Sequence, residues 1–277
     1  MGMRITTNVA SLNAQKVMTT NSREMQKSMA QLSTGSRITK AGDDAAGLAI
    51  SENLKGQIRS YGQASRNAND GISMIQTAEQ SMGEVSNIVT RLRELGVQAA
   101  SDTIGDKERG FIQREVDALK SEIQRVAESA TFGSRKLLDG SGGVYDIHIG
   151  TGNNEATDWI AYDSSSTDVT VATLGIADLD FNSKEAARSG LSALDEAQSS
   201  VNGARANLGA MQNRLSSTTD VIGTMVENMN AANSRIRDTD VAASTSELAR
   251  NNVLLQGTTA TLAQANQLPQ LALKLLG

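Results

Sequence analysis

Two long stretches of this sequence repeat apolar residues at alternating intervals of four and three positions. They cover residues 54–75 and 187–236, and the middle of the chain between them, at 141–182, lacks the repeat. An average spacing of 3.5 residues keeps one side of a helix against a partner helix along its whole length. We therefore expect the chain to run out and back along itself. The predicted fold class is mainly α, an elongated antiparallel coiled-coil rod with a small β-hairpin region in the middle of the chain.

The composition favours long helices over a compact enzyme. Aromatic residues make up 3% of the 277 residues, and the only proline is Pro269. Compact cores depend on aromatic side chains for buried area, and prolines interrupt helices. The net charge of −5 without a basic cluster argues against nucleic-acid binding, and the absence of cysteine excludes thiol catalysis and thiolate metal sites. We predict no enzymatic activity, no cofactor and no metal site.

The pattern divides the chain into five parts that mirror each other about the middle. Residues 1–43 are predicted to form an amphipathic helix and a linker, and residues 44–140 a long helix followed by a second helix. Residues 141–182 form the hairpin region. Residues 183–237 form a return helix, and residues 238–277 form a last amphipathic helix.

Within the hairpin region, alternating residues at 144–149 and the stretches 158–162 and 168–174 predict one or two hairpins. We expect the two terminal helices at one end of the rod and the hairpins at or near the other end.

Few residues suggest chemistry. His148 is the only histidine and stands near Asp146, but a hydrolase needs a nucleophile as well, so we favour a solvated strand residue. Asp43 and Asp44 form a carboxylate pair that suits either a cation or a helix cap, and the apolar helix that follows favours the cap. Four polar residues interrupt the second repeat and either fix its register or mark a turn of the seam toward solvent: Gln198, Arg205, Gln212 and Asn233.

Motifs at both ends of the chain closely resemble those of bacterial flagellins. They cover about residues 1–140 and 185–277, in the family's order. The motifs are NVASLNAQ (8–15), QLSTGSRI (31–38), DDAAGLAIS (43–51), RLRELGVQAA (91–100), the helix at 112–140, VNGARANLGAMQNRL (201–215), ENMNAANSRIRDTDVA (227–242) and LAQANQLPQLALKLL (262–276).

The resemblance implies a structural subunit that is exported through the flagellum's own secretion apparatus and polymerises into the flagellar filament, supporting motility. The filament would be extracellular, or periplasmic where flagella are internal. Implied partners are other copies of the chain, the export apparatus, a flagellin-specific chaperone, the filament cap and hook-associated proteins, without nucleic acid or a membrane anchor. The terminal segments would be disordered in the monomer and fold on assembly, since a lone amphipathic helix has nothing to cover its apolar stripe.

The resemblance also implies roles for individual residues. Packing in the polymer is expected at Leu12, Asp43, Asp44, Leu48, Leu262 and Leu268. Chaperone binding is expected at Leu268, Leu271 and Leu275, although such leucines also suit a membrane surface. Contact with the vertebrate innate-immune flagellin receptor is expected at Arg91, Leu95 and Glu122. Gly96 departs from the family, in which Ala or Ser is more usual at this helix-interior position.

Two other functions fit parts of the pattern. A hook–filament junction protein shares the terminal helices but polymerises poorly. An intracellular coiled-coil scaffold would have rigid helices in the monomer, whereas a flagellin has ends that mild proteolysis removes.

Overall fold

The computed structural model describes residues 7–274, with side chains from residue 7 to residue 267. The chain forms two compact units. The terminal unit combines residues 1–56 with residues 228–277, and the central unit comprises residues 57–227.

The terminal unit contains two helices with well-defined ends. Helix α1 (Val9–Thr34) begins after Asn8, whose side chain accepts a hydrogen bond from a first-turn amide, and ends at Gly35 with a φ of 68°. Helix α6 (Val241–Lys274) begins after Asp240, whose carboxylate accepts from the amides two and three residues on at 2.9 and 3.1 Å. These caps satisfy backbone groups that a helix end leaves without partners.

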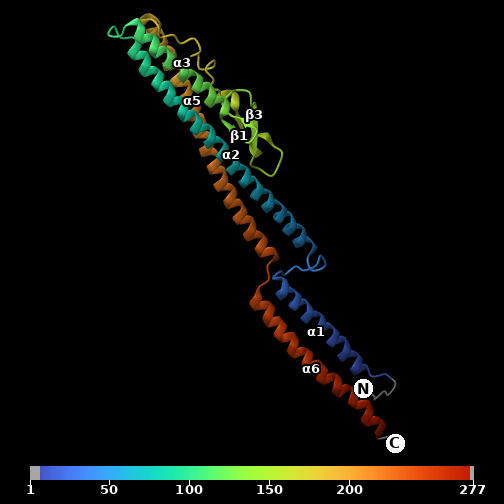
Figure 1. Cartoon of the computed structure of the whole chain (residues 1–277). Coiled ribbons are helices and arrows are strands. Elements are labelled where there is room, and N and C mark those ends of the chain that lie inside the picture. The colour runs from blue at the N-terminus through green and yellow to red at the C-terminus, as the bar shows by residue number, and fades with distance from the viewer. Residues whose placement is uncertain (1–6, 275–277) are drawn as a thin grey trace. The chain divides into compact units, whose positions relative to one another are not determined.

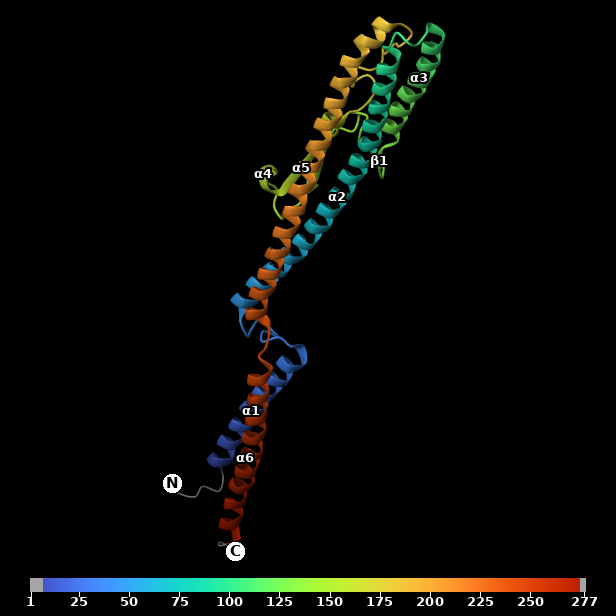
Figure 2. The same cartoon turned by 90° about the vertical axis from the view of Figure 1, so that its left-hand side faces the viewer.

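Helices α1 and α6 lie side by side and antiparallel (Figures 1 and 2). At one end of the pair the Asn8 side chain donates to the Ala265 carbonyl at 2.8 Å. At the other end the amide of Thr239 donates to the carbonyl of Gly35 at 3.0 Å.

The central unit is built around α2 (Ala45–Ala99), α3 (Asp106–Ser129) and α5 (Lys184–Arg237), which pack as a bundle. Within this unit every residue of the two predicted apolar seams is buried or half-buried. The seam of α2 continues at the same spacing beyond the predicted stretch, through Ala78, Met82, Val85, Val89, Leu92, Gly96 and Ala99. The predicted mainly helical class with small hairpins is confirmed.

Polar residues in the α5 seam bond across to α2 in the central unit. The Gln198 amide donates to the Ser86 hydroxyl at 2.9 Å, and Arg205 pairs with Glu79 at 2.8 Å. A slip of one turn would break both contacts, since each joins one residue to one partner. The geometry therefore favours the interpretation that these polar positions fix the register.

The region between α3 and α5 holds two small antiparallel pairs. Strand β3 (Val144–His148) pairs with β4 (Trp159–Asp163), which confirms a hairpin of this region. The short helix α4 (Glu155–Asp158) precedes β4, and the 3₁₀ turn η1 (Ser164–Thr167) follows it. The sequence analysis missed the two-residue strands β1 (Thr131–Phe132) and β2 (Arg135–Lys136), which are too short to show alternation.

The expectation of a strand at 168–174 is wrong. The Asp168 carboxylate accepts hydrogen bonds from the Thr170 amide at 2.9 Å and the Thr173 hydroxyl at 2.6 Å, which closes a turn. Val169 and Leu174 are buried without a neighbouring strand. Hydrogen bonds from an aspartate side chain to nearby groups of the chain compete with strand pairing, and in this segment they prevail.

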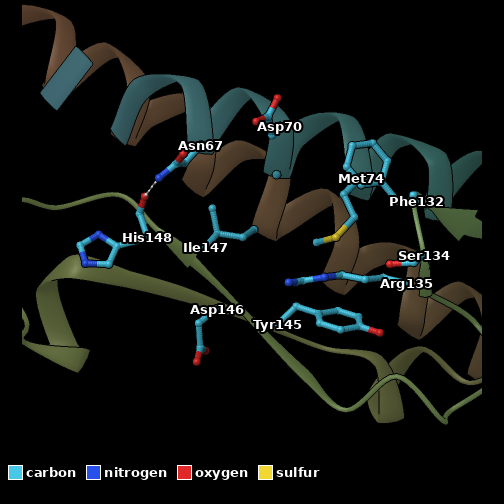
Figure 3. Close-up of a pocket in the computed structure, with 12 residues that line it drawn as sticks. Asn67, Asp70, Met74, Phe132, Ser134, Arg135, Tyr145, Asp146, Ile147 and His148 are labelled. Atoms are coloured by element: carbon cyan, nitrogen blue, oxygen red, sulfur yellow. Dashed lines mark hydrogen bonds between the residues drawn. The ribbon is translucent and has the colours of Figure 1, made fainter. Parts of the chain in front are cut away.

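The hairpins are expected at or near an end of the rod, but within the central unit they do not lie at the turn that joins α2 to α3. There α3 runs back along α2 (Figures 1 and 2). The chain returns to the level of Asn67 and Met74, so β3 packs beside this part of α2 (Figure 3). The Asn67 side chain donates to the His148 carbonyl at 2.9 Å. A Cβ on Gly71 would meet Ile147 at 2.7 Å, which marks how closely strand and helix approach.

Two helix-interior glycines make room for the buried ring of Phe181. A Cβ on Gly96 of α2 would lie 3.2 Å from this ring and 3.0 Å from Leu191. A Cβ on Gly190 of α5 would lie 2.9 Å from the ring and from Leu179. The unusual glycine at position 96 therefore has a packing reason that outweighs its cost of about 1 kcal/mol in a helix.

We predict that Gly190→Ala is less stable than Gly209→Ala by about 1–3 kcal/mol. Both changes gain the same helix propensity, but Gly209 of α5 has nothing within 4 Å of a Cβ, whereas Gly190 is crowded. Urea denaturation of the two variants and the parent measures the difference. Equal stability of the two variants would contradict the packing role of Gly190.

Candidate assembly surface

The side of α1 that packs in the helix pair carries mainly small, polar and methionine side chains. Its buried and half-buried residues recur at intervals of three and four: Ser11, Ala14, Met18, Asn21, Met25, Ser28 and Leu32. The corresponding residues of α6 are Ser244, Leu248, Asn251, Leu255, Thr258, Leu262 and Ala265. Leu262, one of the predicted polymer-packing residues, is thus half-buried within its own chain.

Several large apolar residues of both helices remain exposed outside this seam, although Leu248, Leu255 and Leu262 of α6 lie within it. On α1 they include Leu12, which is 56% exposed, and on α6 they include Val253, which is 68% exposed. Among the side chains described up to residue 267, the other exposed large apolar residues of the two helices are Val9, Val17, Met29, Val241 and Leu254. Exposed apolar faces of this extent indicate a surface that another molecule covers. Sequence reasoning missed Val17, Val241, Val253 and Leu254, because periodicity alone does not say which stripe faces the partner helix.

The predicted leucines at the end of the chain are only partly described. Leu268 and Leu271 lie on α6, whose backbone continues to Lys274, but their side chains lie outside the described residues. Leu275 also lies outside the described residues. Their proposed roles in packing and chaperone binding stay predictions.

The carboxylate pair at the start of α2 performs two structural tasks. Asp44 accepts a hydrogen bond from the Gly47 amide at 2.8 Å and is the helix cap. Asp43 accepts from the Thr39 hydroxyl at 2.9 Å and from the Thr39 and Lys40 amides at 3.1 and 3.0 Å. The cap interpretation is confirmed for Asp44, whereas Asp43 closes the turn of the linker. Leu48 is half-buried one turn into the helix.

The bonds to Asp43 lower the pKa of its carboxyl below the ordinary value. The hydrogen bond from the Thr39 hydroxyl is the largest cause, followed by those from the Lys40 and Thr39 amides. All three favour the charged form, because a carboxylate accepts these bonds and a protonated carboxyl gives part of them up.

The three residues predicted to contact the immune receptor differ in accessibility. Arg91 is half-exposed and binds Glu94 and Glu115, each at 2.9 Å. Glu122 pairs with its neighbour on the next turn of α3. Leu95 is only 2% exposed and belongs to the core of the central unit. The expectation for Leu95 is therefore corrected: its side chain packs inside the bundle and offers no surface to a partner.

The region of His148 forms a shallow groove rather than a catalytic constellation. The groove is lined by parts of α2, the β1–β2 turn and β3, and Arg135 lies over the Tyr145 ring at 4.8 Å (Figure 3). The His148 ring packs against Trp159, with centroids 6.1 Å apart. Among the residues that the structure describes, no hydrogen bond joins His148 to Asp146, and no group of three or more His, Asp or Glu side chains is placed to hold a metal ion.

None of the helices in the described part of the chain combines the length and apolarity required to cross a lipid bilayer. The apolar side chains that remain exposed are instead spread along faces of α1 and α6. A chain whose terminal helices keep apolar faces uncovered is typical of a subunit of a larger assembly.

Comparison with known proteins identifies the assembly. The family of the bacterial flagellin N-terminal helical region matches residues 5–142, and that of the C-terminal helical region matches residues 191–276. The chain is 42% identical to a flagellin of Halalkalibacterium halodurans over 274 residues, with 99% of this chain and 100% of the relative covered. It is 40% identical to the "flagellar filament 33 kDa core protein" of Treponema phagedenis over 290 residues, with 99% and 100% covered.

Solved structures show the same fold. The Bacillus cereus flagellin structure matches with a TM-score of 0.51 and 26% identity, over 61% of this chain and 94% of that one. A putative flagellar hook-associated protein of Vibrio parahaemolyticus matches with a TM-score of 0.57 over 71% and 100%, but its 14% identity supports the fold alone.

The chain belongs to the bacterial flagellin family. It is a structural subunit of the extracellular flagellar filament, and the family is one of structural proteins rather than enzymes. The alternative of an intracellular coiled-coil scaffold is therefore wrong.

We predict that Leu95→Ala lowers the free energy of unfolding by about 2–5 kcal/mol, the usual cost of a cavity at a buried leucine. Arg91→Ala, four residues away on the surface of α2, should cost about 1 kcal/mol or less, because exposed ion pairs contribute little. Urea denaturation followed by circular dichroism compares the two. Similar small losses for both would contradict the core position of Leu95.

We also predict an acid-dependent opening of the linker turn at Asp43. The folded pKa lies below the unfolded value of about 3.9, so the stabilisation is complete above that value and is lost as the pH falls through the folded pKa. The opening of the turn is measured by hydrogen exchange at the Thr39 and Lys40 amides, with each rate corrected for the intrinsic exchange rate at that pH. In Asp43→Asn, which does not titrate, protection should be independent of pH. The same pH dependence in parent and variant would contradict the assignment.

Proposed function

We propose that copies of this flagellin polymerise by covering the apolar faces of α1 and α6 with the terminal helices of neighbouring copies. The main supporting observation is that large apolar residues of these helices, such as Leu12 and Val253, are exposed although the two helices are already paired. Burying one such side chain contributes about 1.5–3 kcal/mol. Several of them on each subunit supply enough free energy to hold a filament together.

The proposal assigns different tasks to the predicted packing residues. Leu12 contributes to contacts between copies, whereas Leu262 packs within its own helix pair and Asp43, Asp44 and Leu48 hold the linker and the start of α2. Leu268 lies on the last turns of α6, and we propose that it also contributes to contacts between copies.

The proposal extends to partners outside the filament. A chaperone would cover the apolar end of α6, with Leu268, Leu271 and Leu275, before export. The other proposed partners are the flagellar export apparatus, the filament cap and hook-associated proteins. An innate-immune receptor would read the exposed charged side chains Arg91 and Glu122. The supporting observations are the membership of the family and, for the receptor, the solvent-accessible side chains of Arg91 and Glu122.

We expect the double variant Leu12→Ser/Val253→Ser to raise the protein concentration needed for filament growth on seeds by roughly a hundredfold or more. Loss of two buried apolar contacts accounts for this size of effect. Growth is measured with purified protein by light scattering and electron microscopy, so that export does not enter the result.

Val221→Ser is the matched control, because Val221 is 50% exposed but lies in the central unit. It should grow filaments like the parent. Normal growth of the double variant, or a stronger effect of Val221→Ser, would overturn the proposal. Failure of the parent itself to elongate on seeds would favour a hook–filament junction protein.

A further inference from the structure

The two linkers of the terminal unit are hydrogen-bonded to each other. Ser36 and Asp238 form an antiparallel β-bridge, and the Thr239 amide donates to the Gly35 carbonyl at 3.0 Å. Gly35 directly follows α1, and Thr239 lies two residues before α6. The contact, which we call the linker clasp (residues 35–37 with 236–239), therefore holds the end of α1 level with the beginning of α6.

Arg37 binds the exposed end of α5 within this clasp. Its amide donates to the Arg237 carbonyl at 2.6 Å, and its guanidinium donates to the Ile236 carbonyl from Nη2 at 2.8 Å and from Nε at 3.3 Å. The last carbonyls of a helix lack partners within the helix and carry partial negative charge, so a guanidinium is a favourable cap. The Gln31 side chain of α1 donates to the Arg37 carbonyl at 2.7 Å and ties the cap to that helix.

The end of α5 is itself fixed to α2 in the same unit. The Ser51 hydroxyl donates to the Asn233 side chain at 2.7 Å, and Arg237 pairs with Glu52. Arg37 therefore binds a part of the chain that is already anchored.

The middle of the seam between α1 and α6 has no side-chain hydrogen bond to fix its register: among the described residues, such bonds lie at one end, from Asn8 and Ser11. Serine, alanine, asparagine and methionine dominate the α1 side, and the α6 side adds Leu248, Leu255 and Leu262. A slip by one helical turn moves the helices by about 5.4 Å and exchanges one set of apolar contacts for another. The specific contacts lie at the two ends: the linker clasp, and the Ser11 hydroxyl donating to Asn266 at 2.9 Å.

We infer that Arg37 is a positioning residue that sets the register of α1 against α6, and with it the alignment of Leu12 and Val253 on the face that neighbouring copies cover. This inference rests on the proposed function for its role in assembly. The register itself is a property of the helix pair within one copy, so it is measured in assembled copies independently of how much filament forms.

The chain has no cysteine, so an introduced pair contains the only thiols. Ser11→Cys/Asn266→Cys reports the observed register, and Ser11→Cys/Leu262→Cys reports a slip of one turn. In the parent background we expect the first pair to form its disulfide in strong preference to the second, because disulfides tolerate only short distances. Arg37→Ala should reduce this preference about tenfold through loss of the charge-assisted bonds.

Arg37→Lys keeps the charge without the guanidinium fork, so its disulfide preference should lie between those of the parent and Arg37→Ala. Arg23→Ala, which removes an arginine of α1 outside the linker clasp, should retain the parental preference. The disulfides are quantified in seeded filaments, with circular dichroism as a check on helix content. A parental preference in filaments of Arg37→Ala would overturn the inference. That outcome is distinct from normal growth of Leu12→Ser/Val253→Ser, which would overturn the proposed surface instead.

Discussion

The apolar seam between α2 and α5 supports the rest of the central unit. Its residues recur every three or four positions and are covered within the chain, so this part of the protein folds around a core of its own. Polar pairs such as Arg205–Glu79 cross the seam and fix its alignment. The glycines at 96 and 190 admit the ring of Phe181, which closes one part of the core with one of the few aromatic side chains.

The terminal helices follow the opposite arrangement. Their paired faces combine small and polar residues with a few leucines and methionines, whereas other large apolar residues such as Leu12 and Val253 remain exposed. A monomer of this kind leaves favourable burial to contacts with other molecules, which is the physical requirement of a filament subunit. The hydrogen bonds at the linkers add specific contacts at one end of the α1–α6 pair.

The structure was needed to decide which of the roles implied by the resemblance each residue can have. Asp43 and Asp44 are neighbours in sequence, yet one closes a turn and the other caps a helix. Leu95 lies in a motif associated with recognition, but its side chain is inside the bundle. Arg37 attracted no attention in the sequence, because its partners are backbone carbonyls some two hundred positions away, and no side-chain pattern records such contacts.

The sequence by itself determined the helical class, the approximate course of the long helices and the family, because periodicity and local motifs are properties of short stretches. It also predicted the pairing region around residues 144–149 from alternation. Only the tertiary structure decided where the hairpin packs, which stripe of α1 faces α6 and why position 96 is glycine. They depend on the return of α3 along α2, on which face of α1 packs against α6, and on the ring of Phe181 beside Gly96. Such choices are made by contacts between residues far apart in the chain, which the order of residues alone does not reveal.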